Sequence, residues 1–371
     1  MTDFEFNKKV LVRLAEDVDN QSVLDLSPRC VQVGMVTMYP DRSPVFNRIH
    51  RLLDPDSYHF IALSNSRVVG MLGTLHTDFY FQDKPVQTAY FMDFKVDPDF
   101  RLGITAFRLV KRSLDRERES GIRLALATLL KNNEAPMVFT KGRGGFPASL
   151  YLGDNRIFSY VPVRHLKTDH RFVIRQATDS DIPDLVMLYN RFYSTYRLAP
   201  RITEKAFRHY ITEIAGLSLD RFFVACEGDK IKAVLGAWDA RSIKKYRVTQ
   251  SNFRVKLLSG LVKFLSLFGR MPEPVQINEP LKQLTLVLYA HDDCTDALAT
   301  LFRHINNLHL GGEYSIIQVQ IHEDDKANES LRGLTGVSLY SELHVFTDTL
   351  QFARDIQNTT GPVHLEFPNY I

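Results

Sequence analysis

The sequence predicts an α/β chain built from two copies of one domain. Its 371 residues are enough for two domains of ordinary size, and 44% of them are hydrophobic, which suffices for a core in each. Segments with strand periodicity and helix periodicity alternate along the chain, and similar segments recur at a nearly constant spacing. We therefore expect one domain within residues 1–167 and a second within residues 168–371.

The repeat is visible at two places in each copy. Residues 12–19 recur in type as residues 174–181, with Ala15 and Ala177 lying 162 residues apart. A hairpin pattern that ends at Gly73 recurs as one that ends at Gly236, 163 residues later. We interpret the two matches as a tandem duplication of a strand, a helix, a hairpin and further strands.

The segment of the first copy with the most chemical information runs from residue 90 to residue 121. Residues 90–96 are expected to form a strand, in which successive side chains point to opposite faces. One face would carry Tyr90, Met92, Phe94 and Val96, and the other would carry Phe91, Asp93 and Lys95. The residues 97–99 end that strand, and helical spacing begins at Ile104 and continues to a cap at Gly121. Free amides and the dipole at a helix N-terminus attract phosphate, and Gly103 lets the backbone approach a ligand closely.

These residues resemble the GNAT superfamily, the acyltransferases that use acyl-coenzyme A (acyl-CoA). In that family the fourth strand leads into an R-x-x-G-x-G/A turn and a helix whose first amides hold the pyrophosphate. Arg101 matches the basic position and Ala106 the final small residue, while Gly103 stands one place early for the first glycine. Downstream, a strand is expected over 124–129. Asn132 and Ala135 then resemble the family's N-x-x-A positions, and Gly145 and Phe146 resemble its G-F pair.

The resemblance implies two GNAT-like domains, each with a mixed central sheet flanked by helices. It also implies an acyl-CoA-dependent N-acyltransferase with acetyl-CoA or another acyl-CoA as co-substrate and an amine of a small molecule or peptide as acceptor. The active site would lie in the first copy, with pantetheine against the end of the strand and pyrophosphate against the turn. The cofactor-binding residues implied in this way are Phe94, Lys95, Val96, Arg101, Leu102, Gly103, Ile104, Thr105, Ala106 and Asn132.

Asp93 is the candidate catalytic residue. An amine attacks a thioester only when deprotonated, so the site needs a proton acceptor within hydrogen-bond reach. Asp93 stands three places before Val96, where related enzymes often carry an acid, and the flanking Phe91 and Phe94 are expected to raise its pKa. The alternative is a structural carboxylate paired with Lys95 or with a cation on a neighbouring strand.

The departing thiolate has no obvious proton donor. Family members often carry a tyrosine seven places beyond the asparagine, and Phe139 occupies that position here. Three alternatives remain: solvent protonates the thiolate, another tyrosine such as Tyr151 replaces the missing one, or the site binds acyl-CoA without turnover. The third alternative describes a sensor or scaffold module. Tyr151 also fits a half-buried strand tyrosine before Gly153.

The second copy is expected to keep the fold and lose the phosphate loop. A strand over 284–290 is followed by residues 291–294, which contain neither arginine nor glycine. A helix over 297–307 and a strand over 315–321 complete the layout. We expect this copy to complete an interface or to shape the substrate cleft.

Relative to the first copy, the second has gained roughly thirty residues within 241–280, and this insertion is strongly basic. It has no acidic residue between Asp239 and Glu273, and apolar residues within 253–268 fall on one helical face. Such a helix can lie on anionic lipid, but packing on the protein with solvated cations is the alternative we favour. Nucleic-acid binding is not expected, because aromatic residues are not interleaved with the cations.

The remaining features exclude several classes. Three cysteines without paired or metal-type spacing, and a charged N-terminal stretch, predict a reduced cytoplasmic protein. The net charge of +3 does not by itself indicate nucleic acid. His50, His59 and His76 show no metal spacing, so no metal site is expected. Neither a G-x-S-x-G elbow nor a Walker-type loop occurs.

Overall fold

The computed structural model describes residues 10–34, 36–101, 104–131, 140, 149–253, 272–347 and 349–364. The first half of the chain contributes β1 (Leu11–Leu14), α1 (Asn20–Leu24), β2 (Val36–Asp41), α2 (Arg48–Leu53), β3 (Tyr58–Ser64), β4 (Arg67–Phe81), β5 (Lys84–Val96), α3 (Thr105–Glu119), β6 (Leu124–Leu130) and β7 (Ser149–Tyr160).

The second half contributes a corresponding series. It comprises β8 (Val173–Gln176), α5 (Ile182–Tyr193), β9 (Ala199–Pro200), α6 (Glu204–Glu213), β10 (Phe222–Glu227), β11 (Lys230–Trp238), β12 (Lys245–Ser251), β13 (Gln283–His291), α8 (Thr295–Leu308), β14 (Ile316–His322), β15 (Gly336–Thr347) and α9 (Leu350–Asn358). Both hairpins, the strand before the predicted phosphate turn and the helix after it occur where the sequence predicts them. The predicted cap of α3 is confirmed, because Gly121 adopts a positive φ of 80°.

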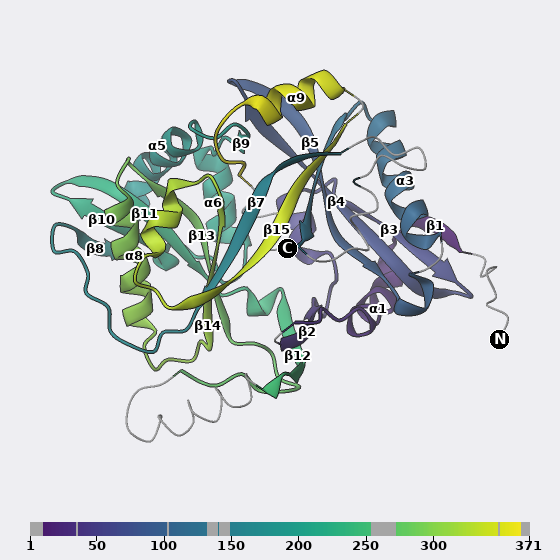
Figure 1. The fold of residues 1–371 in the computed structure, drawn as a ribbon, viewed down its shortest axis with the longest axis horizontal. Coiled ribbons are helices and arrows are strands. Elements are labelled where there is room, and N and C mark those ends of the chain that lie inside the picture. The colour runs from purple at the N-terminus through teal and green to yellow at the C-terminus, as the bar shows by residue number, and fades with distance from the viewer. Residues whose placement is uncertain are drawn as a thin grey trace.

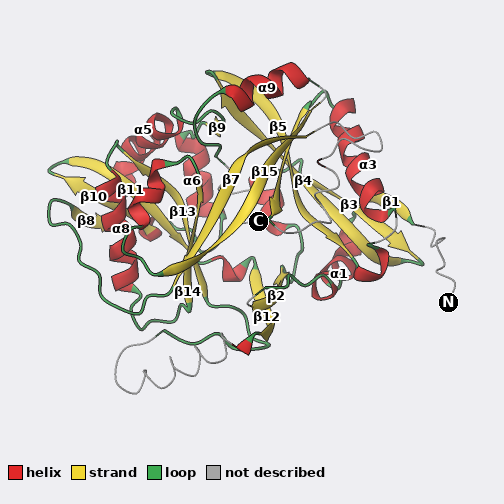
Figure 2. Cartoon of the chain, in the orientation of Figure 1, coloured by secondary structure: helices red, strands yellow, loops and turns green. Residues whose placement is uncertain are grey.

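One mixed sheet of 13 strands runs through the whole molecule. Its order is β1-β3-β4-β5-β6-β15-β7-β14-β13-β11-β10-β8, with the short β9 paired to β4. Helices flank the sheet in both halves, α3 beside β3 and β4 in the first and α5, α6 and α8 around β10, β11 and β13 in the second (Figures 1 and 2). This arrangement is the expected mixed sheet flanked by helices.

The last strand of each half is exchanged into the middle of the sheet. β15 lies between β6 and β7, and β7 lies between β15 and β14, with all three pairings antiparallel. The two exchanged strands cross the centre of the molecule side by side (Figure 1). The halves therefore share one sheet, and the division into two domains at residue 167 stays a prediction.

The two halves also repeat a local geometry at their first helical turn. Arg13 forms an ion pair with Asp19 at 2.6 Å, and Arg175 forms one with Asp181 at 2.7 Å. Both aspartates complete a capping box at the start of the following turn. The repeated contact supports the proposed duplication with evidence that residue type alone does not supply.

Three hydrophobic clusters hold the sheet and its helices together. The largest extends from β4 and β5 across to α5, α8 and α9, a second packs α3 on the first half of the sheet, and a third lies under α1. Part of the insertion is ordered as β12, which pairs with β2 in a small separate sheet. The predicted amphipathic helix at 253–268 falls almost entirely outside the described residues. Within the described ranges, no helix combines the length and the apolar character that crossing a membrane requires.

Candidate active site

A β-bulge in β5 shapes the centre of the first half. Gly73 of β4 pairs with Met92 and Met71 pairs with Lys95, so β5 carries one extra residue between these pairs. Asp93 lies in the bulge with a φ of 52°. The bulge interrupts side-chain alternation, and the predicted continuous alternation from residue 90 to residue 96 is wrong for this reason. Phe91 and Val96 both pack on the α3 side, whereas Tyr90 and Met92 pack in the large cluster on the other side.

β5 and β6 separate next to this bulge. Their parallel pairing covers Thr88 to Phe91 on β5 and Leu124 to Ala127 on β6, although β5 continues to Val96 and β6 to Leu130. The end of β5 therefore lies beside a gap between two parallel strands. This segment contains Phe94, Lys95 and Val96, whose backbone the sequence analysis assigns to pantetheine.

The turn between β5 and α3 is anchored by Asp97. This buried carboxylate accepts hydrogen bonds from Arg29 Nε at 2.7 Å, from Arg67 at 2.8 Å and from the Asp99 amide at 3.2 Å. Burial alone would raise the pKa of Asp97, but the Asp99 amide and the two arginines lower it. From the sequence, residues 97–99 are predicted only to end the strand. The pair Asp97-Pro98 is typical of a capped turn, and this local pattern could have indicated that Asp97 anchors the turn.

The N-terminus of α3 faces the end of this turn. Its N-cap residue, Ile104, has no side-chain oxygen and provides no side-chain cap for the first helical amides. The helix also approaches β4 closely, since a Cβ at Gly70 would lie 3.0 Å from Leu109 and 3.2 Å from Thr105. Arg101 donates through Nε to the carbonyl of Val96 at 3.2 Å and precedes the helix. Thr105 and Ala106 occupy its first turn, whereas the predicted ligands Leu102, Gly103 and Asn132 lie outside the described residues.

Asp93 is paired with cations. Its carboxylate lies 2.8 Å from Arg42 Nε and 3.0 Å from Lys95 Nζ, and all three side chains are buried. Burial alone would raise the pKa of Asp93, but the charges of Arg42 and Lys95 outweigh burial and hold the pKa well below its usual value. The predicted upward shift is therefore wrong, and the carboxylate is ionised. The structure contains the alternative arrangement considered for Asp93. Its carboxylate pairs with Lys95 and with Arg42, a cation from outside β5.

Two buried histidines complete the group around Asp93. His50 Nε2 lies 3.7 Å from the Asp93 carboxylate, and the rings of His50 and His59 are 4.8 Å apart. Burial first, and then the charge of Arg42, keep the pKa of His50 well below its usual value. Burial lowers the pKa of His59 to about 3, so both rings are neutral near pH 7.

The prediction that His50 and His59 form no cluster is wrong. With Asp93 they place one ligand atom each within 4.8 Å of one another, a spacing that can surround a metal ion. Electrostatics oppose a dication there, because Arg42 and Lys95 already contact the only carboxylate of the group. The chemistry of this donor set therefore fits neutral or anionic ligands better than a metal.

The second half of the chain closes this site. β12 pairs with β2 along Lys245 to Ser251, and Arg247 forms an ion pair with Asp41 at 2.6 Å. The preceding residue, Lys244, is buried, and burial together with the charge of Arg42 holds its pKa well below the usual value. Arg42 and Lys244 could not be identified from the sequence, because no motif marks either residue and they approach β5 through the β2–β12 pairing.

The equivalent bulge in the second half is apolar. Gly236 of β11 pairs with Val287 and Val234 pairs with Ala290, so β13 carries the same extra residue as β5, and Leu288 has a φ of 48°. By this register Leu288 takes the place of Asp93 and Ala290 that of Lys95. Phe222 faces Gly236 as His59 faces Gly73. These two bulge positions are thus charged in the first half and apolar in the second.

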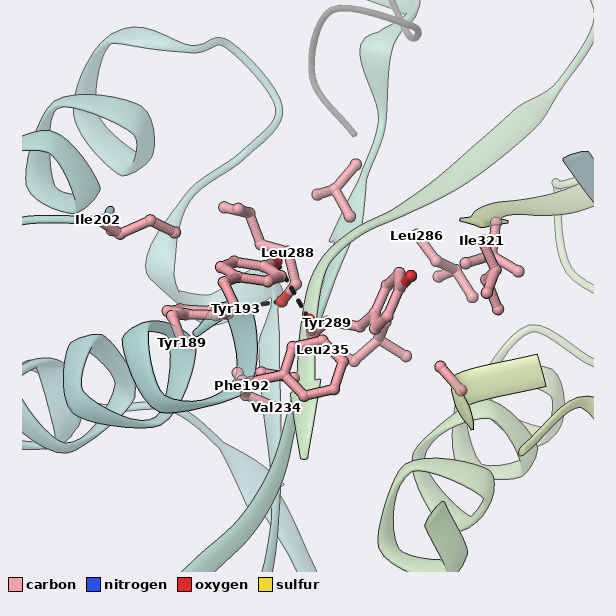
Figure 3. Close-up of a cluster of buried hydrophobic side chains, with 14 of the residues drawn as sticks. Tyr189, Phe192, Tyr193, Ile202, Val234, Leu235, Leu286, Leu288, Tyr289 and Ile321 are labelled. Carbon is pink, nitrogen blue, oxygen red and sulfur yellow. Dashed lines mark hydrogen bonds between the residues drawn. The ribbon is translucent and has the colours of Figure 1, made fainter. Parts of the chain in front are cut away.

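Aromatic side chains fill the space beside the second bulge. Tyr189 donates through its hydroxyl to the carbonyl of Leu288 at 2.9 Å, and Tyr193 donates to that of Tyr289 at 3.2 Å (Figure 3). Both tyrosines belong to α5 and are fully buried. These contacts occupy backbone groups that correspond to the end of β5.

Tyr151, considered above as a proton donor, is held by two carboxylates. Its hydroxyl donates to Asp154 at 2.7 Å and lies 3.2 Å from Glu323. Burial and these neighbouring charges raise the pKa of Tyr151, which makes its hydroxyl a weak acid. Phe139 lies outside the described residues.

A separate cavity of about 840 Å³ lies in the second half, bordered by η7 (Ala240–Ser242), β12 and residues 273–282. Its charged lining is largely paired internally, as Arg241 binds Asp239 and Lys282 binds Glu273. The chemistry of the first-half bulge, with its buried and incompletely paired charges, therefore makes a better candidate for the active site than this hollow.

Comparisons with known proteins concern the family and the fold. Residues 24–144 match the sequence model of the Acetyltransferase (GNAT) family. No curated protein matches the sequence significantly. The fold is similar to that of Saccharomyces cerevisiae N-myristoyltransferase with bound myristoyl-CoA, at 13% identity and a TM-score of 0.61, over 93% of this chain and 84% of that chain.

Two further solved structures share the fold. A GCN5-related N-acetyltransferase from Anabaena variabilis has 10% identity and a TM-score of 0.52, over 91% of this chain and 72% of that chain. Another from Kribbella flavida has 10% identity and a TM-score of 0.50, over 91% of this chain and 70% of that chain. These likenesses concern architecture.

Proposed function

Residues 24–144 match the family model of the GNAT acetyltransferases, and we propose that this chain is an acyl-CoA-dependent N-acyltransferase whose reaction takes place at the bulge of β5. The observation that carries the proposal is a contrast between the two halves. The first half combines a bulge, a gap between parallel strands and a helix N-terminus next to polar side chains, whereas the second half fills the same bulge with aromatic rings.

The cofactor would lie along the end of β5 and the start of α3. The backbone from Phe94 to Val96 lies beyond the pairing of β5 with β6, and its groups on that side would bind the amides of pantetheine. The pyrophosphate would lie against amides from Arg101 to Ala106, where the helix dipole and the cation of Arg101 favour negative charge. Asn132 remains a proposed ligand by resemblance. This placement puts the thioester next to Asp93.

The buried cations offer a way to prepare the acceptor amine without a strong base. An amine that enters the site meets the same burial and the same charges of Arg42 and Lys95 that lower the pKa of Lys244. Its own pKa falls for the same reason, so the neutral, nucleophilic form is favoured. We assign Asp93 the catalytic role of accepting a hydrogen bond from the amine, since its low pKa makes it a weak proton acceptor.

The reaction is then an ordinary acyl transfer. The amine nitrogen attacks the thioester carbonyl, the nearby cations stabilise the oxyanion that forms, and the C–S bond breaks. The amine proton leaves to solvent, and the thiolate takes a proton from solvent, because Tyr151 is engaged with carboxylates. No residue of the described chain has to act as a strong acid.

We propose acetyl as the acyl group. Tyr90 and Met92, beside the gap, are buried in the large hydrophobic cluster, and the Tyr90 hydroxyl bonds to Thr128 of β6 at 2.7 Å. This hydrogen bond joins β5 to β6 just before the gap, and we expect it to leave room for a short acyl chain only. Rates with acyl-CoAs from two to fourteen carbons test the assignment, and a maximum at the long end would contradict it.

The function is tested by ligand binding and turnover. Acetyl-CoA, but not adenosine, is expected to raise the unfolding temperature, and Arg101→Glu should abolish this effect by reversing the charge beside α3. Arg123→Glu, at an exposed position beyond the same helix, provides the matched control. Free-thiol release from acetyl-CoA with a panel of amines measures turnover. The absence of any acyl-CoA effect on stability would refute the proposal.

The second candidate function is a module that binds acyl-CoA without turnover. The position of Phe139, where the family often carries tyrosine, and the low pKa of Asp93 favour it. Stabilisation by acetyl-CoA without thiol release, across amines that carry acidic, basic and neutral groups, would identify the module. Thiol release that falls in Asp93→Ala would identify the enzyme.

A further inference from the structure

Arg42 is a buried cation with unused hydrogen-bonding capacity. It follows β2 and is 4% exposed, and its Nε lies 2.8 Å from the Asp93 carboxylate. Among the described residues, none of its three guanidinium nitrogens has a partner in hydrogen-bond geometry. A guanidinium presents five N–H donors in a planar fork, and burying such donors unsatisfied is unfavourable. The arrangement is therefore suited to a further acceptor group.

The charges around Arg42 do not balance. Arg42 and Lys95 are cations, Asp93 supplies one negative charge, and His50 and His59 are kept neutral by burial. The remaining charge is positive even if Lys244 is left out of the balance. Binding of one monoanion would neutralise the group, and the planar fork of arginine matches the two oxygens of a carboxylate.

The anion must come from the acceptor side of the site. Phe91 and Val96 pack towards α3, where the phosphates of the cofactor are proposed to lie, whereas His50 and His59 lie on α2 and β3 with Arg42. The sheet therefore separates the Arg42 group from the pyrophosphate position. The second half offers no such group, because the position of His59 is taken by Phe222.

We propose that the acceptor is an amine that also carries a carboxylate, and that Arg42 binds this carboxylate beside the bulge of β5. The inference rests on the proposed N-acyltransferase function and names the class of its acceptor. The carboxylate of an amino acid or a similar small molecule would pair with the guanidinium fork, and its amine would then lie near Asp93. Arg42 would then determine specificity for the acceptor, in addition to the effect that its charge has on the amine.

The test compares acids with their amides. Glycine and glycinamide, and β-alanine and β-alaninamide, are used as acceptors with acetyl-CoA, and each is also tested for stabilisation of the CoA-bound protein. We expect kcat/KM for the acids to exceed that for the amides by about ten- to a hundredfold, the range for a charge-assisted contact. Arg42→Gln should remove the preference, Arg42→Lys should retain part of it, and Arg48→Gln on exposed α2 surface should leave it unchanged.

The outcomes separate the inference from the function on which it rests. Stabilisation by acetyl-CoA together with equal use of acids and amides overturns the carboxylate inference alone. Loss of any acetyl-CoA effect overturns the N-acyltransferase proposal. If Arg42→Gln does not fold, the comparison of acids and amides in the natural protein still decides, and inhibition of glycine turnover by acetate but not by acetamide is the expected confirmation. No stabilisation and no turnover with either acid also overturns the inference.

Discussion

Replacing Asp97 by alanine tests whether the turn before α3 is held by its buried carboxylate. The substitution removes the acceptor for Arg29, Arg67 and the Asp99 amide. The two arginines can then form hydrogen bonds with water instead, whereas the amide loses its side-chain cap. Hydrogen bonds to charged groups contribute about 1.5–3 kcal/mol, and partial exposure of the arginines reduces their share. We expect the free energy of unfolding to fall by about 2–3 kcal/mol.

The same substitution should weaken cofactor binding, because Asp97 positions the residues that lead to the N-terminus of α3. Urea unfolding gives the change in stability, and titration with acetyl-CoA gives the change in affinity, which we expect to fall about tenfold for a turn that has lost its fixed geometry. Asp99→Ala, beside it in the exposed part of the turn, is the control and should change stability by less than about 0.5 kcal/mol.

Either of two results would contradict this role of Asp97. Equal unfolding midpoints for the Asp97 and Asp99 variants would show that the ion pairs do not stabilise the turn. Lower stability with unchanged affinity would show that the turn does not position the cofactor. Because the folded pKa of Asp97 is lowered, its stabilisation is present above about pH 4 and is lost as the pH falls, which gives an independent check by acid titration.

Two further predictions follow from single contacts. Tyr193→Phe should lower the free energy of unfolding by about 1–2 kcal/mol, because the buried carbonyl of Tyr289 loses its donor; acetyl-CoA binding measured by titration should not change, and a weaker affinity would argue against a cofactor site in the first half. Hydrogen bonds to Asp54 and Glu117 raise the pKa of His76 to about 9, so its stabilisation is complete below about pH 6.5 and is lost as the pH rises through about 9. His76→Gln should remove this part of the decline in urea midpoint between pH 6.5 and 9, and an unchanged decline would contradict it.

The elements of each half could be predicted from the sequence because their signals are local. The alternation before Val96, the helical spacing after Ile104 and the glycine at position 121 each depend on a few neighbouring residues, and β5 and α3 occur as predicted. The bulge could not be predicted in this way. A positive φ at Asp93 is uncommon for a residue with a side chain, and it is imposed by pairing with β4 rather than by its neighbours in sequence.

The polar group around Asp93 shows where local signals end. Asp93 and its pairing with Lys95 were among the interpretations available from the sequence, because the two residues share one strand. Arg42 and Lys244 were not, since they reach the site through the pairing of β2 with β12, which joins segments about two hundred residues apart. The expected rise in the pKa of Asp93 failed for this reason, because the cation that most opposes it comes from Arg42.

The exchange of β7 and β15 makes the stability of each half depend on the other half. The last strand of the second half, β15, pairs with β6 of the first half, so the second half supports the sheet on which the proposed site lies. Removing residues 168–371 would bare the edge of β6 and leave β7 without either neighbour. Substitutions that disturb the strand pairing of the second half are therefore expected to destabilise the first half as well, whereas substitutions on its surface are not.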